Sequence, residues 1–330
     1  MTIKTGILSF AHMHANSYAR VLCANEKTQL VGIADGDTER GTTNAALYST
    51  RYFGSVEELL GQNLDAIVIA SENIHHRKHV EMCAAAGIKH ILSEKPLATT
   101  VEDAGAMIAA CRTAGAKLYT AFPCRFSPAL QRLRKQIQEG ALGTILAIRG
   151  TNRGYMPGGW FIEKEFSGGG AVIDHTVHVA DVNRWLLGQE ATEVYAEIGN
   201  GFYHQEWEDT GVLTLTYQGG VFATIDTSWS RPYKFRTDLT LQVIGTAGVA
   251  DLDMFLQTVT NYSMKNAVSH VGWGSSVDKW MIDAFLRAAS GECVDDLADG
   301  EDGLRALEVA LAAYRSAEQA SPVCIAPVPV

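Results

Sequence analysis

The chain has 330 residues, more than the ~100–200 residues usual for one domain, which predicts two domains. Hydrophobic residues make up 47% and charged residues 19%, an ordinary composition for a globular protein. The net charge of −10 disfavours nucleic acid as a partner, and no apolar run approaches the ~18 residues of a membrane span.

The first third of the chain alternates short apolar runs with amphipathic stretches. We expect strands at Ile3–Leu8, Gln29–Ala34, Asp65–Ala70, His90–Ser93 and Lys117–Phe122, with helices at Ala15–Leu22, His76–Ala86 and Val101–Ala114. Glycines close the last two helices, and this alternation is typical of right-handed βαβ units. Residues 1–122 are therefore predicted to form a doubly wound parallel sheet that binds ligands at the carboxyl ends of its strands.

The pattern changes after Pro123. Helices are expected at Ser127–Glu139, Ala171–Leu187, Ser276–Ser290 and Glu301–Gln319, and strands at Ile145–Thr151, Val194–Ile198, Gly211–Tyr217, Phe222–Trp229, Thr237–Ile244 and Ala250–Asp253. Side chains alternate along Gly211–Tyr217 with period two, which favours an antiparallel sheet with one covered face. Residues 123–330 are thus predicted to form a second, α+β domain.

Six cysteines are scattered without a C-x-x-C pair or a regular spacing. This pattern favours reduced thiols over disulfides or a structural zinc site. The apolar stretch at residues 7–11 is too short and polar for a signal peptide. The sequence predicts a soluble cytoplasmic protein.

The segment Ser9–His14 lies where a dinucleotide-binding fold carries G-x-G-x-x-G, but it contains none of the three glycines. Ser9 and Ala11 are small enough for a tight turn, and the backbone N–H groups can still face a pyrophosphate at the start of a helix. His12 and His14 either contact phosphate, nicotinamide or substrate, or are ordinary capping or surface histidines.

Asp35 ends the apolar run Leu30–Ala34, where the ribose-binding acid of this fold belongs. A carboxylate there accepts hydrogen bonds from both ribose hydroxyls and repels a 2′-phosphate. Asp35 therefore favours NAD over NADP. The alternative is an ordinary turn acid at a strand end.

Lys95 follows the strand His90–Ser93 and precedes Pro96, so it lies at the carboxyl end of the sheet. Beside a nicotinamide, a lysine could hydrogen-bond a substrate hydroxyl and stabilise the alkoxide that forms as hydride leaves. A surface lysine in a turn is the alternative.

The helix after Gly168-Gly169-Gly170 is apolar on nearly every side, which predicts burial. Asp174, His178 and Asp181 interrupt it at i, i+4 and i+7, on one face. Buried polar groups of this kind are paired or line a cleft. Asp174 in the first turn is expected to orient His178 or raise its pKa, which would make His178 a proton acceptor near neutral pH. The glycines are expected to let the backbone approach a ligand closely.

Other interpretations of the polar residues on this helix remain open. Asp174 and His178 could form a buried structural pair. His175 faces away from the stripe and is expected to be packed. A metal site at Asp174, His175 and His178 is disfavoured because the two histidines do not share a face, so no metal is expected.

Together these segments resemble the Gfo/Idh/MocA oxidoreductases, which include glucose–fructose oxidoreductase and inositol dehydrogenases. The resemblance rests on Ser93-Glu94-Lys95-Pro96, Asp65–Ala70 with His75, and the glycine triplet followed by Asp174, His178 and Asp181, and it spans almost the whole chain. It implies an N-terminal Rossmann domain, a C-terminal domain with a large, mostly antiparallel open sheet, and homodimers or homotetramers formed through that sheet.

By the family's pattern, Lys95, Asp174 and His178 would be catalytic. Lys95 would contact substrate and nicotinamide ribose, His178 would exchange the hydroxyl proton, and Asp174 would position the substrate or His178. The expected cofactor-binding residues are Ser9, Phe10, Ala11, His12, Asp35, Ser71, His75, Glu94 and Lys95. Arg153, Tyr155 and Trp160, with Trp229 and Arg231, could equally contact a sugar ring, pack in the core or join subunits.

The function this implies is hydride transfer between nicotinamide and a secondary hydroxyl of a sugar, inositol or sugar derivative. One alternative is an NAD-dependent glycosidase or lyase that oxidises the sugar transiently. Accumulation of NADH distinguishes the two. A second alternative is a non-catalytic cofactor-sensing protein, which the altered segment Ser9–His14 favours weakly and the intact Lys95, Asp174 and His178 disfavour.

Overall fold

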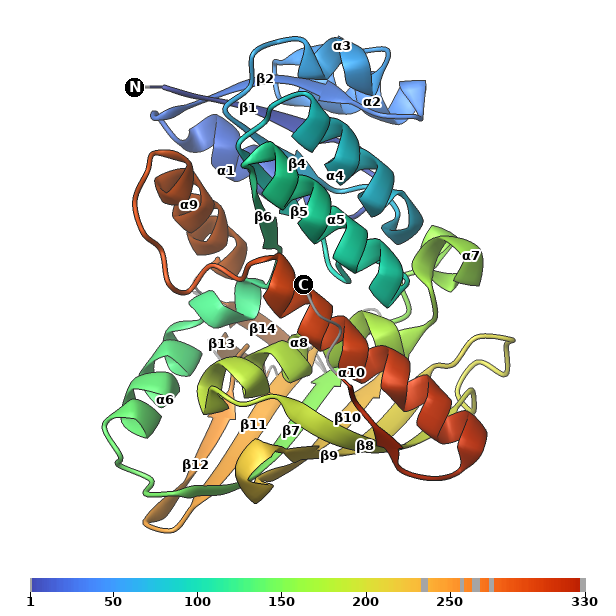
Figure 1. The fold of residues 1–330 in the computed structure, drawn as a ribbon, viewed down its shortest axis with the longest axis vertical. Helices are drawn as coiled ribbons and strands as arrows, with labels where there is room; N and C mark the ends of the chain where they lie inside the picture. The colour runs from blue at the N-terminus through green and yellow to red at the C-terminus, as the bar shows by residue number, and fades with distance from the viewer. Residues whose placement is uncertain (1, 233–236, 256–257, 263–267, 273–275, 327–330) are drawn as a thin grey trace.

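The computed structural model describes residues 2–232, 237–255, 258–262, 268–272 and 276–326. Figure 1 shows the N-terminal part of the chain, blue to green, at one end of the molecule and a second, broad sheet at the other. Within the described residues, no helix is both long and apolar enough to cross a lipid bilayer.

The N-terminal sheet contains six parallel strands in the order β3-β2-β1-β4-β5-β6. Its strands are β1 (Ile3–Leu8), β2 (Thr28–Ala34), β3 (Arg51–Phe53), β4 (Ala66–Ile69), β5 (His90–Ser93) and β6 (Lys117–Thr120). All four residues of β4 are buried, because helices cover both faces of a doubly wound sheet. The predicted Rossmann-type sheet is confirmed.

The helices of this unit are α1 (Ala15–Ala24), α2 (Thr38–Leu47), α3 (Val56–Leu60), α4 (His76–Ala85) and α5 (Val101–Ala114). The sequence did not predict α2, β3 or α3. The two helices begin at side-chain caps, since Asp37 accepts from the Arg40 amide and Ser55 from the Glu58 amide. Caps and tertiary packing, rather than a strong apolar period, define these short elements.

The second sheet has the strand order β12-β11-β7-β10-β9-β8-β15. Its strands are β7 (Ile145–Arg153), β8 (Ala191–Gly199), β9 (Thr210–Tyr217), β10 (Phe222–Ser228), β11 (Asp238–Gly245), β12 (Gly248–Asp253) and β15 (Val323–Cys324). Among the described strands of this sheet, only β7 and β10 pair in parallel. Burial alternates along β9, so the predicted antiparallel sheet with one covered face is confirmed. A separate two-stranded sheet joins β13 (Thr258–Tyr262) to β14 (Val268–Gly272).

Two long helices, α8 (Ala171–Leu187) and α10 (Gly300–Gln319), cover one face of the second sheet. Figure 1 shows α10 crossing between the two sheets, and it contacts α5 and β6 as well as α8 and β8. The shorter helices α6 (Pro128–Gln138) and α7 (Lys164–Ser167) and the 3-10 turns η1 (Asn73–His75), η2 (Pro123–Phe126), η3 (Gly159–Ile162) and η4 (Gln218–Gly220) complete the connections.

Helix α9 (Val277–Ala289) returns to the N-terminal unit, although it lies late in the chain (Figure 1). Its Met281, Ile282 and Phe285 share one apolar cluster with Tyr18 and Leu22 of α1. The predicted second domain, residues 123–330, contains α9, but α9 packs against the first unit. The domain boundary between residues 122 and 123 therefore remains a prediction.

A buried ionic cluster joins the segments around this boundary. Arg125 of η2 donates to both oxygens of Asp181, at 2.9 and 2.5 Å, and its other terminal nitrogen lies 3.1 Å from Asp302 of α10. The Arg125 and Asp181 side chains are 3% and 0% exposed. Asp181, which shares a helix face with Asp174 and His178, therefore has a structural partner of its own.

Asp181→Ala should destabilise the fold by about 3 kcal/mol, because it leaves the buried Arg125 guanidinium without its bidentate partner. Urea unfolding measures the effect. Glu139→Ala is the control, since it removes an exposed pair with Lys135 and should cost less than about 1 kcal/mol. Equal losses in the two variants would show that the Arg125 cluster does not stabilise the fold.

Candidate active site

The site forms where the carboxyl ends of adjacent parallel strands face the start of α8. Because β1, β4 and β5 are neighbours in the sheet, the segments that follow them lie together. A cleft of about 340 Å³ opens there, and side chains of both units line it: His14, Lys95, Tyr155, Asp174, His175 and His178. A volume of this size suits a small ligand.

A buried ion pair spans the cleft between the two units. Lys95 Nζ lies 2.6 Å from Asp174 Oδ1, with the two side chains 5% and 12% exposed. The Lys95–Pro96 peptide is cis. Burial opposes the charged form of Asp174, but the attraction of Lys95 and His175 outweighs it and holds the pKa of this carboxyl well below its usual range. Lys95 and Asp174 are therefore brought together as the sequence predicted.

The imidazole nearest Asp174 is His175, which corrects the sequence-based expectation for this helix. His175 Nε2 lies 3.2 Å from Asp174 Oδ2, and its Nδ1 lies 3.1 Å from the Asn152 carbonyl. His178 also lines the cleft, and its Nδ1 lies 3.8 Å from Cys124 Sγ. Burial, reinforced by Lys95, lowers the pKa of His178 well below its ordinary value. Asp174 acts in the expected direction and raises this pKa, but burial and Lys95 outweigh it.

The glycine triplet contacts the protein's own atoms. A Cβ on Gly169 would lie 2.1 Å from the Tyr314 hydroxyl, and one on Gly170 would lie 2.2 Å from the Glu208 carbonyl oxygen. Glu208 Oε1 accepts from the Gly170 amide at 2.6 Å and the Val172 amide at 3.2 Å, so it caps α8. The glycines are thus explained by close packing rather than by a ligand's approach.

The segment after β1 keeps the shape of a phosphate-binding turn without its glycines. Ser9 adopts φ 68°, the left-handed region that favours glycine. Phe10 donates its amide to Asp35 at 2.7 Å, and buried His12 donates its amide to the Ala70 carbonyl at 2.9 Å. Helix α1 begins with no side-chain cap and no acidic residue in its first turn. Its N-terminus therefore fits a pyrophosphate.

Asp35 ends β2 as predicted, but its carboxylate is already occupied. It accepts from Arg40 Nε at 2.8 Å and Arg40 Nη2 at 2.6 Å, from the Phe10 amide at 2.7 Å and from the Asp37 amide at 3.0 Å. A carboxylate has about four lone-pair sites, so a ribose diol must displace one of these donors. The Arg40 side chain is 31% exposed and is the one that can move.

The other predicted cofactor residues lie along the same edge of the sheet. Buried Ser71 follows β4, and its hydroxyl lies 3.0 Å from His79 Nδ1. Half-buried His75 lies in η1, just beyond it. Ala11 is half-buried, and its backbone amide donates a hydrogen bond to Ser9 Oγ at 3.1 Å. These positions agree with a dinucleotide groove, and ligand contact by these side chains remains a prediction.

Glu94 lies fully buried beneath the cleft. Its Oε1 accepts from the Tyr18 hydroxyl at 2.5 Å and faces His14 Nδ1 at 3.2 Å and His12 Nδ1 at 3.5 Å. Burial opposes its charge, but His12, His14 and Lys95 outweigh burial and keep the pKa of Glu94 well below its usual range. This carboxylate is held ionised.

Among the described residues, one cluster has the spacing of a metal site, with ligand atoms of His12, His14 and Glu94 within 4.8 Å of one another. Protein donors already use these atoms. Glu94 Oε2 accepts the Lys95 amide at 3.0 Å, and His12 Nδ1 accepts the His14 amide at 3.3 Å. We assign the cluster as a hydrogen-bond network.

The structure places some of the predicted substrate residues at the cleft and others away from it. Tyr155 lines the cleft. Trp160 donates its indole N–H to the Ala11 carbonyl at 3.1 Å and stacks on Phe161. Arg153 does not reach the cleft, because it pairs with Asp238 at 3.1 Å and Asp226 at 3.5 Å on the second sheet. Arg231 also pairs with Asp238, whereas fully buried Trp229 donates to Asp174 Oδ2 at 3.1 Å.

Several residues of the site were not identified from the sequence. Tyr18 lies one helical turn after His14, a spacing that could have linked the two. Glu208 and Tyr314 carry no local signal, because each reaches α8 from a distant segment. Asp278 lines the cleft from α9 for the same reason.

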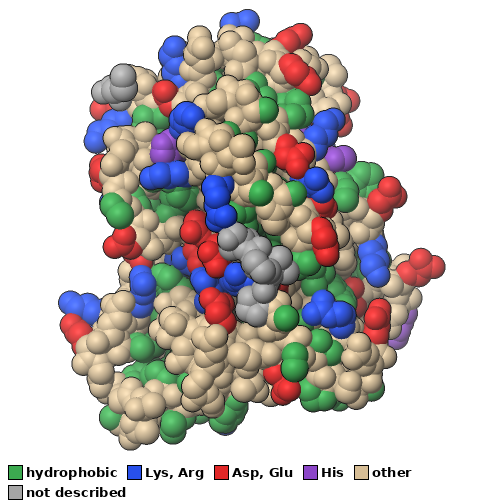
Figure 2. Space-filling view, viewed as in Figure 1, with side chains coloured by type: hydrophobic (Ala, Val, Ile, Leu, Met, Phe, Trp, Pro, Cys, Tyr) green, Lys and Arg blue, Asp and Glu red, His purple; other side chains and the backbone are tan. Residues whose placement is uncertain are grey.

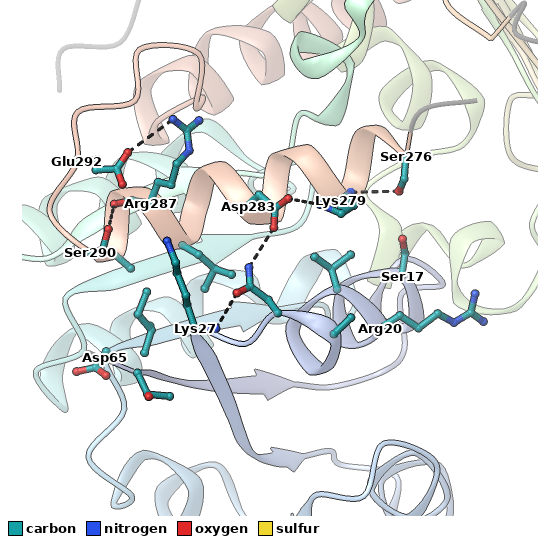
Figure 3. Close-up of a pocket in the computed structure, with 17 residues that line it drawn as sticks. Ser17, Arg20, Lys27, Asp65, Ser276, Lys279, Asp283, Arg287, Ser290 and Glu292 are labelled. Carbon is teal, nitrogen blue, oxygen red and sulfur yellow. Dashed lines mark hydrogen bonds and ion pairs between the residues drawn. The ribbon is translucent and has the colours of Figure 1, made fainter. Parts of the chain in front are cut away.

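A larger groove of about 1030 Å³ lies between α1 and α9, away from this cleft (Figure 3). Its Lys279 and Asp283 pair with each other, and Arg287 lies 3.7 Å from Glu292. In Figure 3 the Arg20 side chain extends away from these pairs. Both ion pairs run along α9 and the turn that follows it.

Two family models match this chain. Residues 4–122 match "Oxidoreductase family, NAD-binding Rossmann fold", and residues 130–251 match the "GFO/IDH/MocA C-terminal domain". The chain is 31% identical over 304 residues to the 1,5-anhydro-D-fructose reductase of Ensifer adhaerens, covering 88% of this chain and 89% of that protein. It is 30% identical over 191 residues to the myo-inositol 2-dehydrogenase of Thermotoga maritima, covering 56% and 55%.

Solved structures agree with these matches. GenD2 from gentamicin A biosynthesis, crystallised with NAD, superposes with a TM-score of 0.91 at 25% identity, covering 98% of this chain and 97% of that one. A putative myo-inositol dehydrogenase from Sinorhizobium meliloti 1021 gives a TM-score of 0.85 at 25% identity, covering 98% and 100%.

Proposed function

Because the chain belongs to the Gfo/Idh/MocA family of oxidoreductases, we propose that it transfers hydride between a secondary hydroxyl of a sugar, inositol or sugar derivative and the nicotinamide of NAD. The carrying observation is the buried Lys95–Asp174 pair in a cleft at the carboxyl edge of the Rossmann-type sheet. Residues 1–122 bind the cofactor in this proposal, and residues 123–330 supply the substrate side of the cleft.

The cleft residues would divide the chemistry among them. NAD supplies the hydride acceptor. Lys95 donates a hydrogen bond to the substrate oxygen and stabilises negative charge as it develops there. Asp174 holds the ammonium in place, and Trp229 and His175 hold Asp174. His178 contacts the hydroxyl from the next turn of α8, and Tyr155 borders the sugar ring.

The cofactor is proposed to be NAD rather than NADP. The Asp35 carboxylate at the end of β2 would repel a 2′-phosphate. Arg40 complicates this choice, because a guanidinium beside the ribose site is also a good phosphate ligand. Asp35 binds the Nε and Nη2 edge of that guanidinium, so in this proposal Asp35 sets the preference.

The molecule is proposed to form homodimers or homotetramers through the open face of the second sheet. Val212 of β9 and Phe222 of β10 are 51% and 54% exposed on that face, and Val249 of β12 is exposed on the same face. Figure 2 shows hydrophobic side chains along the lower rim of the molecule, where the second sheet lies. Exposed apolar side chains on an uncovered sheet are typical of a subunit interface.

Lys95→Met should lower kcat/KM by about a hundredfold to a thousandfold, because the substrate oxygen loses its charged donor. NADH formation with a polyol and sugar panel measures this, with exposed Lys135→Met as the control. Wild-type turnover in Lys95→Met contradicts the assignment. Product release without NADH accumulation would instead support the transient-oxidation chemistry.

Asp35→Ser should raise the NADP-to-NAD ratio of kcat/KM by about tenfold to a hundredfold, since Arg40 is then free to pair with a 2′-phosphate. Steady-state kinetics with both cofactors measures the ratio. The double variant Asp35→Ser with Arg40→Ala should lose most of that gain. A wild-type enzyme that already prefers NADP would refute the role given to Asp35.

Phe222→Asp should convert the wild-type oligomer to monomers, because a carboxylate in an apolar interface is costly to desolvate. Light scattering after size-exclusion chromatography measures the mass. Leu47→Asp is the matched control, since Leu47 is 66% exposed on α2, away from the sheet, and should leave the oligomer intact. A monomeric wild-type protein at the same concentration would refute the interface.

A further inference from the structure

His76 is a buried histidine that the proposed chemistry does not use. It is the first residue of α4, just beyond η1 and the end of β4, and it is fully buried. Nδ1 of its ring lies 3.1 Å from the Pro96 carbonyl oxygen and 3.2 Å from the Leu97 carbonyl oxygen. Nε2 lies 3.2 Å from the Ser71 carbonyl oxygen. The ring therefore bridges the segment after β4 and the turn that follows Lys95.

The carbonyl groups of Pro96 and Leu97 depend on this ring. Both residues are buried, and they lie in a bend outside any strand or helix. Among the described residues, the hydrogen bonds to these two carbonyl oxygens come from His76 alone. A buried carbonyl without a donor is costly, because it has lost the water that would otherwise pair with it. His76 thus supplies a hydrogen bond that the backbone of this turn does not make for itself.

The carbonyl groups on each side of the His76 ring assign its proton. Burial lowers the pKa of His76 against the attraction of Glu94, so the ring carries one proton at neutral pH. A neutral imidazole has one donor nitrogen and one acceptor nitrogen. A proton on Nδ1 faces two carbonyl oxygens, whereas a proton on Nε2 would face one and leave a lone pair against the other two. The contacts therefore favour the tautomer that is protonated at Nδ1.

The backbone of Lys95 is held on both sides. Before it, the Glu94 carboxylate accepts the Lys95 amide at Oε2, at 3.0 Å. After it, the Pro96 carbonyl accepts from His76. Between these two anchors the lysine side chain reaches Asp174 Oδ1 at 2.6 Å. A charged group can follow the geometry of a reaction only as closely as the backbone that carries it is fixed, and a shift of about 1 Å can cost a hundredfold in rate.

Resting on the dehydrogenase function above, we infer that His76 is a positioning residue, whose Nδ1–H holds the turn after Lys95 and so sets where the Lys95 ammonium meets the substrate oxygen. The His76 ring is not among the side chains that line the cleft. It acts through the Pro96 carbonyl rather than by contact with the substrate. Its Nε2 side meets Ser71, so the same ring links this turn to a segment predicted to face the cofactor.

Two amide substitutions separate the two sides of the ring, because an asparagine amide can replace the donor at Nδ1 and a glutamine amide the one at Nε2. His76→Gln should lower kcat by about tenfold to a hundredfold and change the substrate KM by less than about threefold, since Lys95 is misplaced for the charge that develops in the transition state. His76→Asn should restore most of that loss. His204→Asn, at an exposed histidine outside the cleft, should keep the wild-type kcat. Thermal unfolding verifies that each variant is folded. Equal kcat in the Gln and Asn variants, or a larger loss in His76→Asn, overturns the inference.

NMR of the histidine ring nitrogens in the cofactor-free wild type gives a readout that needs neither turnover nor a stable variant. The His76 ring should show a proton on Nδ1 at neutral pH, and its signals are identified by their absence from either variant. A bare Nδ1 refutes the inference. A wild type that shows this proton but turns over none of the sugars and polyols in the panel would refute the dehydrogenase function and leave the bridge between His76 and Pro96 standing.

Discussion

The Lys95–Asp174 ion pair is the constraint on which the site depends. Its lysine follows β5 of the first sheet, and its aspartate lies in the first turn of α8, so the pair exists only when the two units are in register. Separating these two buried charges is costly, because each would then be a buried charge with neither an ionic partner nor water to stabilise it. Trp229, His175 and the Glu208-capped start of α8 then hold the aspartate at that position.

Much of the fold could be predicted from local patterns, because buried parallel strands and long amphipathic helices leave strong periodic signals. Helices α5 and α8 begin and end where the sequence places them. The segment with α2, β3 and α3 was missed, since its elements are short and depend on caps at Asp37 and Ser55. The return of α9 to α1 was also missed, because long-range packing has no local signature.

The candidate site also contains residues that could be predicted from the sequence and residues that could not. Lys95 and Asp174 could be placed together because the resemblance to the family assigns both residues to one catalytic group. The choice between His175 and His178 as the partner of Asp174 depends on how α8 is rotated against β7, where Asn152 binds the His175 ring. The position of Arg153 could not be predicted from its residue type, because Asp226 and Asp238 on neighbouring strands pair with its guanidinium away from the cleft.

The packing of α9 on α1 also means that the core of the first unit can be completed only late in synthesis of the chain. The N-terminal strands leave the ribosome first, but Tyr18 and Leu22 stay uncovered until residues 277–289 have been made. The first unit can form its sheet early, and its core closes last. Until then its apolar surface is open to chaperones and to aggregation with other nascent chains. The two ends of the chain are thus interdependent during folding, even though residues of both halves line the cleft.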